Sequence, residues 1–379
     1  MLRIAFDAKR ALNNVTGLGN YSRLVIEAIA GSGIDAELLL MTAPGATLER
    51  VWKLLAMPNV RLEEGTGFAA RHMQWLWRSR SMVGDLRRLR PDIYHGLSNE
   101  LPLDIEKSGI PSVVTIHDLI WRRFQSDYTA IDRRLYDMKY GRSARAATRV
   151  IAISECTKRD IISDFGVDPD RIDVIYQGCD SQFASASVEE IARVRSRYGI
   201  GDNPYIIAVG TVQGRKNQLL AVKGLRALPQ DVRLVIVGRR TAYARDIDAY
   251  VSAHPGLAER ILWLEGIPFA DLPALYSGAL FSTYTSFYEG FGIPLVESLR
   301  CGVPVIAATG SCLEEAGGPG ALYVDPHDAD AWADAAQMLT EDKALRGRMV
   351  REGQAHCEAF DNASFADNFI RTYRKALTL

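Results

Sequence analysis

Short apolar runs rich in β-branched residues recur along the whole chain, each bounded by Gly, Pro, Asp or Asn. They lie at residues 2–6, 36–41, 93–95, 112–116, 150–153, 205–209, 232–237, 261–264 and 303–307. Continuous apolar runs of this length are typical of strands buried on both faces. Stretches with helical spacing separate most of them, at residues 20–30, 132–145, 216–228, 243–253 and 295–301. This alternation predicts an α/β fold built from doubly wound parallel sheets.

The pattern also indicates where the chain divides. A strand-like run at 172–176 is followed by a small, polar stretch at 177–187, and the alternation then begins again. A length of 379 residues is more than one core usually organises, so we expect two domains. We predict an N-terminal domain over residues 1–178 and a C-terminal domain over 179–360. Residues 361–379 are predicted to form a helix that packs back on the N-terminal domain.

Composition and charge narrow the class of protein. Hydrophobic residues make up 47% and charged residues 24%, which is typical of a water-soluble globular chain. The net charge of -1 argues against a protein that coats nucleic acid. That total hides an asymmetry, because residues 1–150 carry a net +6 and residues 151–379 a net -7. The two halves are therefore expected to meet different ligands.

The cysteines and the N-terminus bear on the compartment. The five cysteines are odd in number and show no metal-ligand spacing, which favours reduced thiols. The first strand leads directly into Asp7, without a signal-peptide apolar region, and no 18 apolar residues run together. We therefore expect a cytoplasmic protein with no membrane span.

The segment EGFGIPLVE, residues 289–297, carries the strongest chemical signal. Gly290 and Gly292 allow backbone conformations that other residues rarely adopt, and Pro294 after them suits the first turn of a helix. Glu289 is thus predicted on the loop and Glu297 inside the first turns. Amide groups at such a helix start bind anions, and the two carboxylates would accept hydrogen bonds from sugar or ribose hydroxyls. The alternative is a capping Glu289 and a solvated Glu297.

A second candidate anion site follows the strand at 205–209. Arg215 and Lys216 stand at the start of a predicted helix, where cations oppose the helix dipole. A bound anion explains two adjacent cations there better than helix stability does. The alternative is a solvated basic turn.

Three strand ends in the first half add weaker candidates. A G-x-G at Gly17 and Gly19 leads into a helix, but the full dinucleotide fingerprint is missing, so a nicotinamide cofactor is not expected. His117, next to Asp118, follows the strand at 112–116, at the carboxyl edge where open α/β sheets bind ligands. His95 is a weaker candidate for the same edge. A structural hydrogen-bonding role is the alternative for both histidines.

Residues 71–90 contain six arginines and one acid, Asp85, together with Trp75, Met82, Leu86 and Leu89 at helical spacing. Two interpretations stay open: contact with an anionic membrane surface, or an ordinary amphipathic helix that covers the first sheet. The D-x-D strings that begin at Asp168 and Asp328 sit in turns, so they are predicted to cap helices. No metal site is expected.

These motifs together resemble the retaining glycosyltransferases of family 4, the group 1 glycosyltransferases, which have the GT-B fold. The resemblance rests on the E-x7-E of Glu289 and Glu297 and extends along most of the chain. It includes TGLGNY, HGLSNELP, THDL, AISECTKRDI, VIYQGCD, VGTVQGRKN, CGVPVIA and LEEAGGPGALYVDP. It implies two Rossmann-like domains that face a central crevice.

The resemblance also implies roles for individual residues. Arg215 and Lys216 would neutralise the donor diphosphate, Glu297 would hydrogen-bond the ribose, and Glu289 with neighbouring amides would hold the donor sugar. His117 would lie against the transferred sugar. His117, Glu289, Arg215 and Lys216 form the implied catalytic set. The implied substrate-binding set is Gly17, Gly19, Asn99, Gly290, Phe291, Gly292, Ile293 and Glu297. Some members of the family place the Arg nearer the strand, at the position where this chain has Thr211. How Arg215 and Lys216 share the neutralisation of the diphosphate therefore stays open.

The implied function is transfer of a hexose from GDP-mannose or a UDP-sugar, with retention and without a metal or another cofactor. The acceptor would be a glycan or lipid-linked glycan in bacterial surface polysaccharide synthesis, bound mainly by the basic first domain. A lipid-linked acceptor would bring the protein to the inner face of the cytoplasmic membrane. Two alternatives stay open: a nucleotide-sugar epimerase of the same architecture, and a non-catalytic sugar-binding protein.

Overall fold

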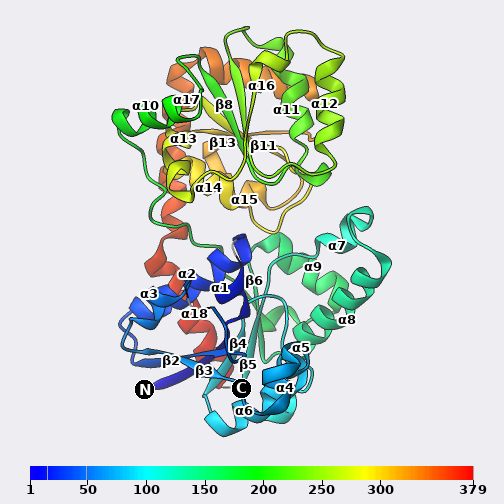
Figure 1. The fold of residues 1–379 in the computed structure, drawn as a ribbon, viewed down its shortest axis with the longest axis vertical. Coiled ribbons are helices and arrows are strands. Elements are labelled where there is room, and N and C mark those ends of the chain that lie inside the picture. The colour runs from blue at the N-terminus through cyan, green and yellow to red at the C-terminus, as the bar shows by residue number, and fades with distance from the viewer. Residues whose placement is uncertain (15, 48, 379) are drawn as a thin grey trace. The chain divides into compact units, whose positions relative to one another are not determined.

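The computed structural model describes residues 1–14, 16–47 and 49–378 and divides the chain into two compact units (Figure 1). Unit 1 combines Met1–Gly178 with Phe360–Leu379, and unit 2 is Cys179–Ala359. The chain therefore passes from one unit to the other twice, after Gly178 and after Ala359. We take these units as the two proposed domains and describe each by itself.

Unit 1 is built on a parallel sheet whose described strands run in the order β3-β2-β1-β4-β5-β6-β7. Their bounds are Leu2–Asp7 (β1), Ala36–Thr42 (β2), Val60–Glu64 (β3), Ile93–Gly96 (β4), Ser112–Ile116 (β5), Arg149–Ala152 (β6) and Ile172–Val174 (β7). The strand order reverses at β1 and β4, which are neighbours. In open sheets of this kind the carboxyl edge beside such a reversal is where ligands bind.

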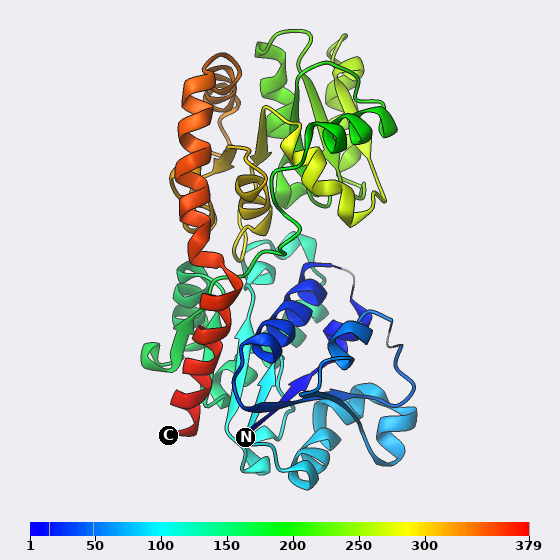
Figure 2. The same cartoon turned by 90° about the vertical axis from the view of Figure 1, so that its left-hand side faces the viewer.

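Helices flank this sheet. Their bounds are Lys9–Asn13 (α1), Gly17–Gly31 (α2), Trp52–Leu55 (α3), Gly67–His72 (α4), Gln74–Leu76 (α5), Met82–Leu89 (α6), Ile120–Arg123 (α7), Ala130–Ala146 (α8), Glu155–Phe165 (α9) and Asn362–Leu377 (α18). A π-helical turn, η1, spans Trp77–Ser81 between α5 and α6. Helix α18, red in Figures 1 and 2, packs beside α2 and against β4 and β5. The end of the chain thus belongs to the core of unit 1.

Unit 2 contains a second parallel sheet, whose described strands run in the order β10-β9-β8-β11-β12-β13. The strands are Tyr205–Val209 (β8), Arg233–Val237 (β9), Ile261–Leu264 (β10), Phe281–Tyr284 (β11), Val305–Ala308 (β12) and Ala321–Val324 (β13). The helices are Val188–Arg197 (α10), Gln218–Gly224 (α11), Ala244–Ser252 (α12), Leu272–Ser277 (α13), Ile293–Arg300 (α14), Leu313–Gly317 (α15), Ala329–Glu341 (α16) and Lys343–Cys357 (α17). Here the order reverses between β8 and β11.

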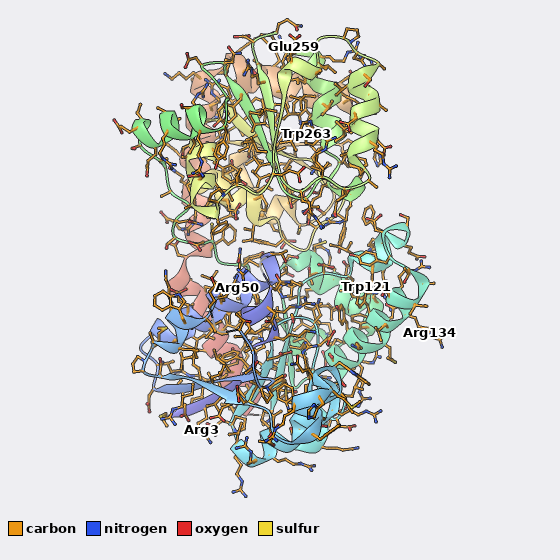
Figure 3. All side chains as sticks on the ribbon, viewed as in Figure 1. Arg3, Arg50, Trp121, Arg134, Glu259 and Trp263 are labelled. Atoms are coloured by element: carbon orange, nitrogen blue, oxygen red, sulfur yellow. The ribbon has the colours of Figure 1, made fainter. Side chains whose placement is uncertain are left out.

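Each unit has its own hydrophobic core. Trp121 of α7 is buried in the core of unit 1 (Figure 3). Trp263 of β10 lies at the margin of the core of unit 2, and the Arg240 guanidinium is 4.3 Å from its ring centre. No helix within the described residues is both long enough and apolar enough to cross a bilayer.

The predicted α/β class with two doubly wound sheets is confirmed. The apolar runs correspond to strands, but the pattern does not predict β3, β11 or β13. Strand β3 is an edge strand with exposed charged positions, and β11 (FSTY) is buried yet half polar. A rule that looks for continuous apolar runs misses such strands, because tertiary context decides their burial.

Candidate functional site

Two loops of unit 2 meet at the carboxyl edge of its sheet. Arg215 and Lys216 follow β8 in the short helical turn Gly214–Lys216, and Glu289 follows β11. Strands β8 and β11 are adjacent and parallel, so their carboxyl ends lie side by side. The topology therefore brings together residues that are more than seventy positions apart in the sequence.

Glu289 is the centre of this ion cluster. Its Oε1 lies 2.7 Å from Arg215 Nη1 and 2.5 Å from Lys216 Nζ. The Tyr284 hydroxyl donates to the same oxygen over 3.2 Å and also accepts a hydrogen bond from Lys216. Glu289 is only 7% exposed. We call Arg215, Lys216 and Glu289 the unit 2 cluster.

The electrostatics of this cluster follow from its burial. Burial by itself would raise the pKa of Glu289, but the charges of Lys216 and Arg215 outweigh it and lower the pKa to about 2. Burial also lowers the pKa of Lys216, which Glu289 partly offsets. Glu289 is therefore ionised at neutral pH, and two cations face one carboxylate. The cluster therefore carries a surplus positive charge, which favours a nearby anion.

Backbone contacts fix the two loops to each other. The Phe287 amide donates to Arg215 O over 2.9 Å, and Arg215 Nη1 donates to Tyr288 O over 2.5 Å. Asn217 adopts the left-handed conformation with φ 55°. Its carbonyl accepts from the Thr285 hydroxyl over 2.9 Å, and its side-chain amide donates to Pro326 O over 2.7 Å. These contacts hold the cations in place before any ligand arrives.

The start of α14 is shaped by glycine and by a thiol. Gly292 has φ 115°, and a Cβ there would lie 2.8 Å from a methyl group of Leu313, so glycine is required. The Cys312 thiol donates to the carbonyls of Glu289 and Phe291, over 3.1 and 3.0 Å. Ile293 is the first residue of α14. The turn thus presents the helix N-terminus next to Glu289.

Glu297 lies within α14, partly buried, and has a different environment from Glu289. Its Oε2 accepts a hydrogen bond from the Tyr276 hydroxyl over 3.2 Å. Burial raises the pKa of Glu297 to about 7, although Tyr276 opposes this. The two carboxylates of the E-x7-E motif therefore differ in charge near neutral pH, since Glu289 is ionised and Glu297 is half protonated.

Sequence reasoning missed Tyr284, Tyr276, Gln218 and Cys312, which contact or border these groups. Lys216, Tyr284 and Gln218 line a small pocket at the ends of β8 and β11. Tyr284 ends a strand that the pattern does not predict, so nothing in the sequence places it beside Glu289. Gln218 lies two positions after Lys216, and this closeness in sequence was the available signal.

In unit 1 His117 follows β5 and is buried. Its Nε2 donates to Leu97 O over 2.9 Å, which leaves Nδ1 as an acceptor, 3.4 Å from Gln177 Nε2. The ring edge meets Tyr21, with ring centres 4.6 Å apart. Burial lowers the pKa of His117 to about 4. The imidazole is therefore neutral at pH 7.

Asn99 supports His117. It has φ 62°, and its side-chain oxygen accepts from the His117 amide over 2.7 Å. His95 is fully buried, with one ring nitrogen 2.8 Å from the Tyr373 hydroxyl and the other 2.9 Å from Thr115 Oγ1. The structure thus brings His117 and Asn99 together. His95 thus contacts the sheet and helix α18, which favours the alternative of a structural hydrogen-bonding role.

Gly17 and Gly19, which the sequence places ahead of a helix, both lie within the first turn of α2. A Cβ on Gly19 would lie 1.9 Å from Asn14 O, whereas Gly17 faces open space. The Asn14 side chain accepts from the amides of Thr16 and Gly19, over 2.7 and 3.3 Å. Gly19 is therefore needed for close packing of the turn. Val15 lies outside the described residues.

The segment 71–90 is not one amphipathic helix, because it is broken into short helices and the π turn η1. Met82 and Leu86 are buried, whereas Trp75 is exposed. The D-x-D prediction is confirmed, since Asp168 accepts from Asp170 N, and Asp328 accepts from Asp330 N and Ala331 N. Within the part of the chain that the structure describes, no group of three or more His, Cys, Asp or Glu side chains is placed to hold a metal.

Two protein families match this chain in succession. Residues 15–183 match the family described as Glycosyltransferase Family 4, and residues 190–356 match Glycosyl transferases group 1. The first match covers most of unit 1 and the second most of unit 2. Together they span nearly the whole chain.

Relatives with known roles are similar over the full length. The chain is 27% identical to O-antigen chain mannosyltransferase B of Escherichia coli, over 98% of this chain and 100% of that protein. It is also 27% identical to the MMP alpha-(1->4)-mannosyltransferase of Mycolicibacterium hassiacum, over 99% and 98%.

Solved structures share the arrangement of elements. Sucrose-phosphate synthase from Thermosynechococcus elongatus superposes with a TM-score of 0.79 at 20% identity, over 100% of both chains. Anabaena HepE in complex with UDP and glucose superposes with a TM-score of 0.76 at 19% identity, over 99% of this chain and 100% of that one. At these identities the likeness concerns the fold.

Proposed function

Because the chain belongs to the group 1 glycosyltransferases of family 4 and has the GT-B fold, we propose that it transfers a hexose from a nucleotide-diphosphate sugar to a glycan. The anomeric configuration is retained in this proposal. The observation that carries it is the unit 2 cluster, with two cations and one carboxylate at the carboxyl ends of β8 and β11.

The surplus positive charge suits the leaving group. When the bond from the anomeric carbon to the donor phosphate breaks, negative charge develops on the nucleoside diphosphate. Arg215 and Lys216, fixed by the loop contacts, would stabilise that charge without reorganisation. Since side-chain cations perform this task, the proposed reaction needs no metal.

The remaining residues would hold the donor. Glu289, ionised and beside the N-terminus of α14, would accept hydrogen bonds from the hexose hydroxyls, with the backbone of Gly290, Phe291, Gly292 and Ile293 next to it. Glu297 would accept hydrogen bonds from the ribose. In unit 1 the neutral His117, positioned by Asn99, would face the hexose, and the α2 turn with Gly17 and Gly19 would approach the diphosphate.

Retention follows from attack on the face that the leaving group vacates. The acceptor hydroxyl oxygen bonds to the anomeric carbon, the phosphate oxygen departs with its electron pair, and the hydroxyl proton passes to that phosphate. This route needs no covalent nucleophile from the protein. It requires only that the phosphate be held close after the bond breaks, which is the role given to Arg215 and Lys216.

The relatives guide the choice of donor and acceptor. The names of the E. coli and Mycolicibacterium proteins favour a mannosyl donor such as GDP-mannose, while the HepE complex keeps a UDP-sugar as the second candidate. An O-antigen relative supports an acceptor that is a glycan or lipid-linked glycan of a bacterial surface polysaccharide. The epimerase and the non-catalytic sugar-binding protein are not favoured, because the relatives are named as transferases.

A lipid-linked acceptor would bring the protein to an anionic membrane at the inner face of the cytoplasmic membrane. Exposed Phe68, Arg71 and Arg80 in unit 1 would make that contact, whereas Arg78 is ion-paired and partly buried. Vesicles with anionic lipid should bind the wild type at low salt and release it at high salt. An Arg71→Glu/Arg80→Glu variant that still binds them equally well rules out this surface.

The catalytic proposal is tested by separating donor binding from turnover. A thermal-shift screen with UDP, GDP, ADP and their sugars identifies the donor, since a ligand of the folded state raises Tm. Glu289→Gln and Glu289→Ala should then keep nucleotide binding but lose transfer. Lys223→Ala, an exposed lysine of α11, is the control. If the rate of nucleotide release does not increase when acceptor is added, the proposed transfer is contradicted.

A further inference from the structure

A small cavity lies beside Lys216, at the carboxyl ends of β8 and β11 in unit 2. Its volume is about 10 Å³, and its polar lining includes Lys216, Gln218, Thr283 and Tyr284. That volume is close to the space that one water molecule needs. The cavity therefore suits a single water, provided that its walls offer hydrogen-bond partners.

Gln218, the first residue of α11, contributes an acceptor. Its side chain is only 6% exposed, and its Nε2 donates to Thr211 O over 3.1 Å. This bond fixes the orientation of the amide, because exchanging its oxygen and nitrogen would set two acceptors against each other. Oε1 accepts from no described residue, and Thr211 does not line the cavity. Oε1 is thus the polar atom of Gln218 that is left to face the cavity.

Two donors on the other walls also lack a full set of partners. The Lys216 ammonium has three protons, and the described residues accept only two of them, at the Tyr284 hydroxyl and at Glu289 Oε1. Thr283 Oγ1 accepts from Trp332 Nε1 over 2.9 Å, and no described residue accepts the proton of that hydroxyl. Two unmatched protons and one unmatched acceptor thus border the same small space.

We propose that one water molecule in this cavity accepts a hydrogen bond from Lys216 Nζ and donates one to Gln218 Oε1, which makes Gln218 a positioning residue for Lys216. The Thr283 hydroxyl donates to the second lone pair of the water. Three partners are typical for a buried water, and each group left unmatched by the protein is then satisfied. That Lys216 serves the leaving diphosphate rests on the proposed function.

The water also bears on the charge of Lys216. Burial lowers the pKa of Lys216, Glu289 raises it and Arg215 lowers it further. The charged and titratable groups that face the ammonium come from its own turn, from β11 and the loop after it, and from the residue before α15: Arg215, Tyr284, Glu289 and Cys312. A water whose proton is held by Gln218 turns a lone pair toward the ammonium, which favours its charged form. Loss of the Gln218 carbonyl should therefore let Lys216 lose its proton at a lower pH.

Crystal structures of the wild type and of Gln218→Met test the water directly. The methionine side chain has a similar length and no polar atom that can replace Oε1. In the wild type we expect a water within hydrogen-bond distance of both Gln218 Oε1 and Lys216 Nζ, and in the variant its loss or displacement. A wild-type structure that resolves ordered waters but shows none in this cavity overturns the proposal.

The positioning role is tested by calorimetry with GDP and UDP between pH 7 and pH 10, without acceptor. Wild-type affinity should fall as pH rises through the pKa of Lys216, because a neutral amine no longer attracts the diphosphate. Gln218→Met should move the midpoint of this fall about one pH unit lower. Leu220→Ala is the matched control, because Leu220 is a buried residue of α11 that does not line the cavity. It should lower stability and leave the midpoint unchanged.

A second variant gives the opposite sign. Gln218→Glu places a carboxylate beside the ammonium and should move the midpoint to higher pH. This variant also provides the test if Gln218→Met does not fold.

The outcomes separate this proposal from the proposed function. An unchanged midpoint in both Gln218 variants, or an equal loss of affinity at every pH, means that Gln218 acts only through the fold and overturns its positioning role. If neither nucleotide binds the wild type at any pH, the proposed function fails, and the crystal structures still decide whether the cavity holds the water.

Discussion

The two units carry ion clusters of different charge balance at the carboxyl edges of similar sheets. In unit 2, Arg215 and Lys216 surround Glu289, with two cations for one carboxylate. In unit 1, Arg78 pairs with Asp7 and Glu100, and Lys139 Nζ lies 3.9 Å from Glu100 Oε1, so two cations balance two carboxylates. Both clusters lie largely out of solvent, where an unbalanced charge is costly unless a ligand or a nearby partner completes it.

The difference teaches what each edge is suited to bind. A surplus cation attracts a diphosphate, whereas a balanced cluster has its charges satisfied within the protein and mainly fixes the loops that carry it. The net charges of the two halves, +6 over residues 1–150 and -7 over residues 151–379, do not predict this, since the cationic cluster lies in the acidic half. Local arrangement, rather than total charge, therefore decides the chemistry of each site.

The largest effect is expected where the unit 1 cluster of Asp7, Arg78, Glu100 and Lys139 loses its central cation. Arg78→Ala removes the cation that pairs with both Asp7 and Glu100, so buried negative charge is left uncompensated, and it should reduce the free energy of unfolding by about 3–5 kcal/mol. Urea denaturation measures this. Arg80→Ala, an exposed neighbour in the same π turn, should change it little. Equal effects at the two positions would contradict a buried ion cluster around Arg78.

In unit 2 the effect should appear in catalysis. Lys216→Ala removes charge stabilisation from the leaving diphosphate and should lower kcat by about 10²–10³. Steady-state nucleotide release with acceptor present measures it, and Lys223→Ala serves as the control. A loss confined to KM indicates that Lys216 only binds the donor.

Glu297 provides a pH test within unit 2. Its pKa in the free protein is about 7, and hydrogen bonds from ribose would favour the carboxylate. Donor binding should then release a proton, so affinity rises with pH and gains about tenfold from pH 6 to pH 8. Calorimetry at several pH values measures this. The Glu297→Gln variant should bind the donor more weakly, and its affinity should not depend on pH. If the affinity of the wild type is also independent of pH, Glu297 does not hydrogen-bond the ribose.

The smallest effect is expected at a carboxylate outside both clusters. Asp328 caps α16 by accepting from Asp330 N and Ala331 N, so Asp328→Ala should cost about 1 kcal/mol of stability. Thermal unfolding measures it, and kcat should be unchanged. Asp330→Ala, which removes a side chain with no cap bond in this turn, is the matched control. A loss of activity would mean that this acid acts beyond capping.

Much of the fold follows from local patterns. The apolar runs at 2–6 and 205–209 became β1 and β8, and Pro294 behind Gly292 became the start of α14. Strand β11 was not predictable, because Ser282 and Thr283 are polar yet buried. Without β11, neither the position of Tyr284 nor its contact with Glu289 can be inferred. The segment 71–90 was open to an amphipathic helix, and only the structure revealed the interruption at Met73 and the π turn that begins at Trp77.

The sequence by itself determined the alternation of strands and helices, the family, and the residue types at the strand ends, because these depend on local periodicity and on motif spacing. The tertiary structure decided which charges meet. Arg215, Lys216 and Glu289 converge because β8 and β11 are neighbours in the sheet, and Asp7, Arg78 and Glu100 converge because η1 packs at the end of β1. Charge balance in a buried cluster depends on such long-range contacts, and local spacing does not encode them.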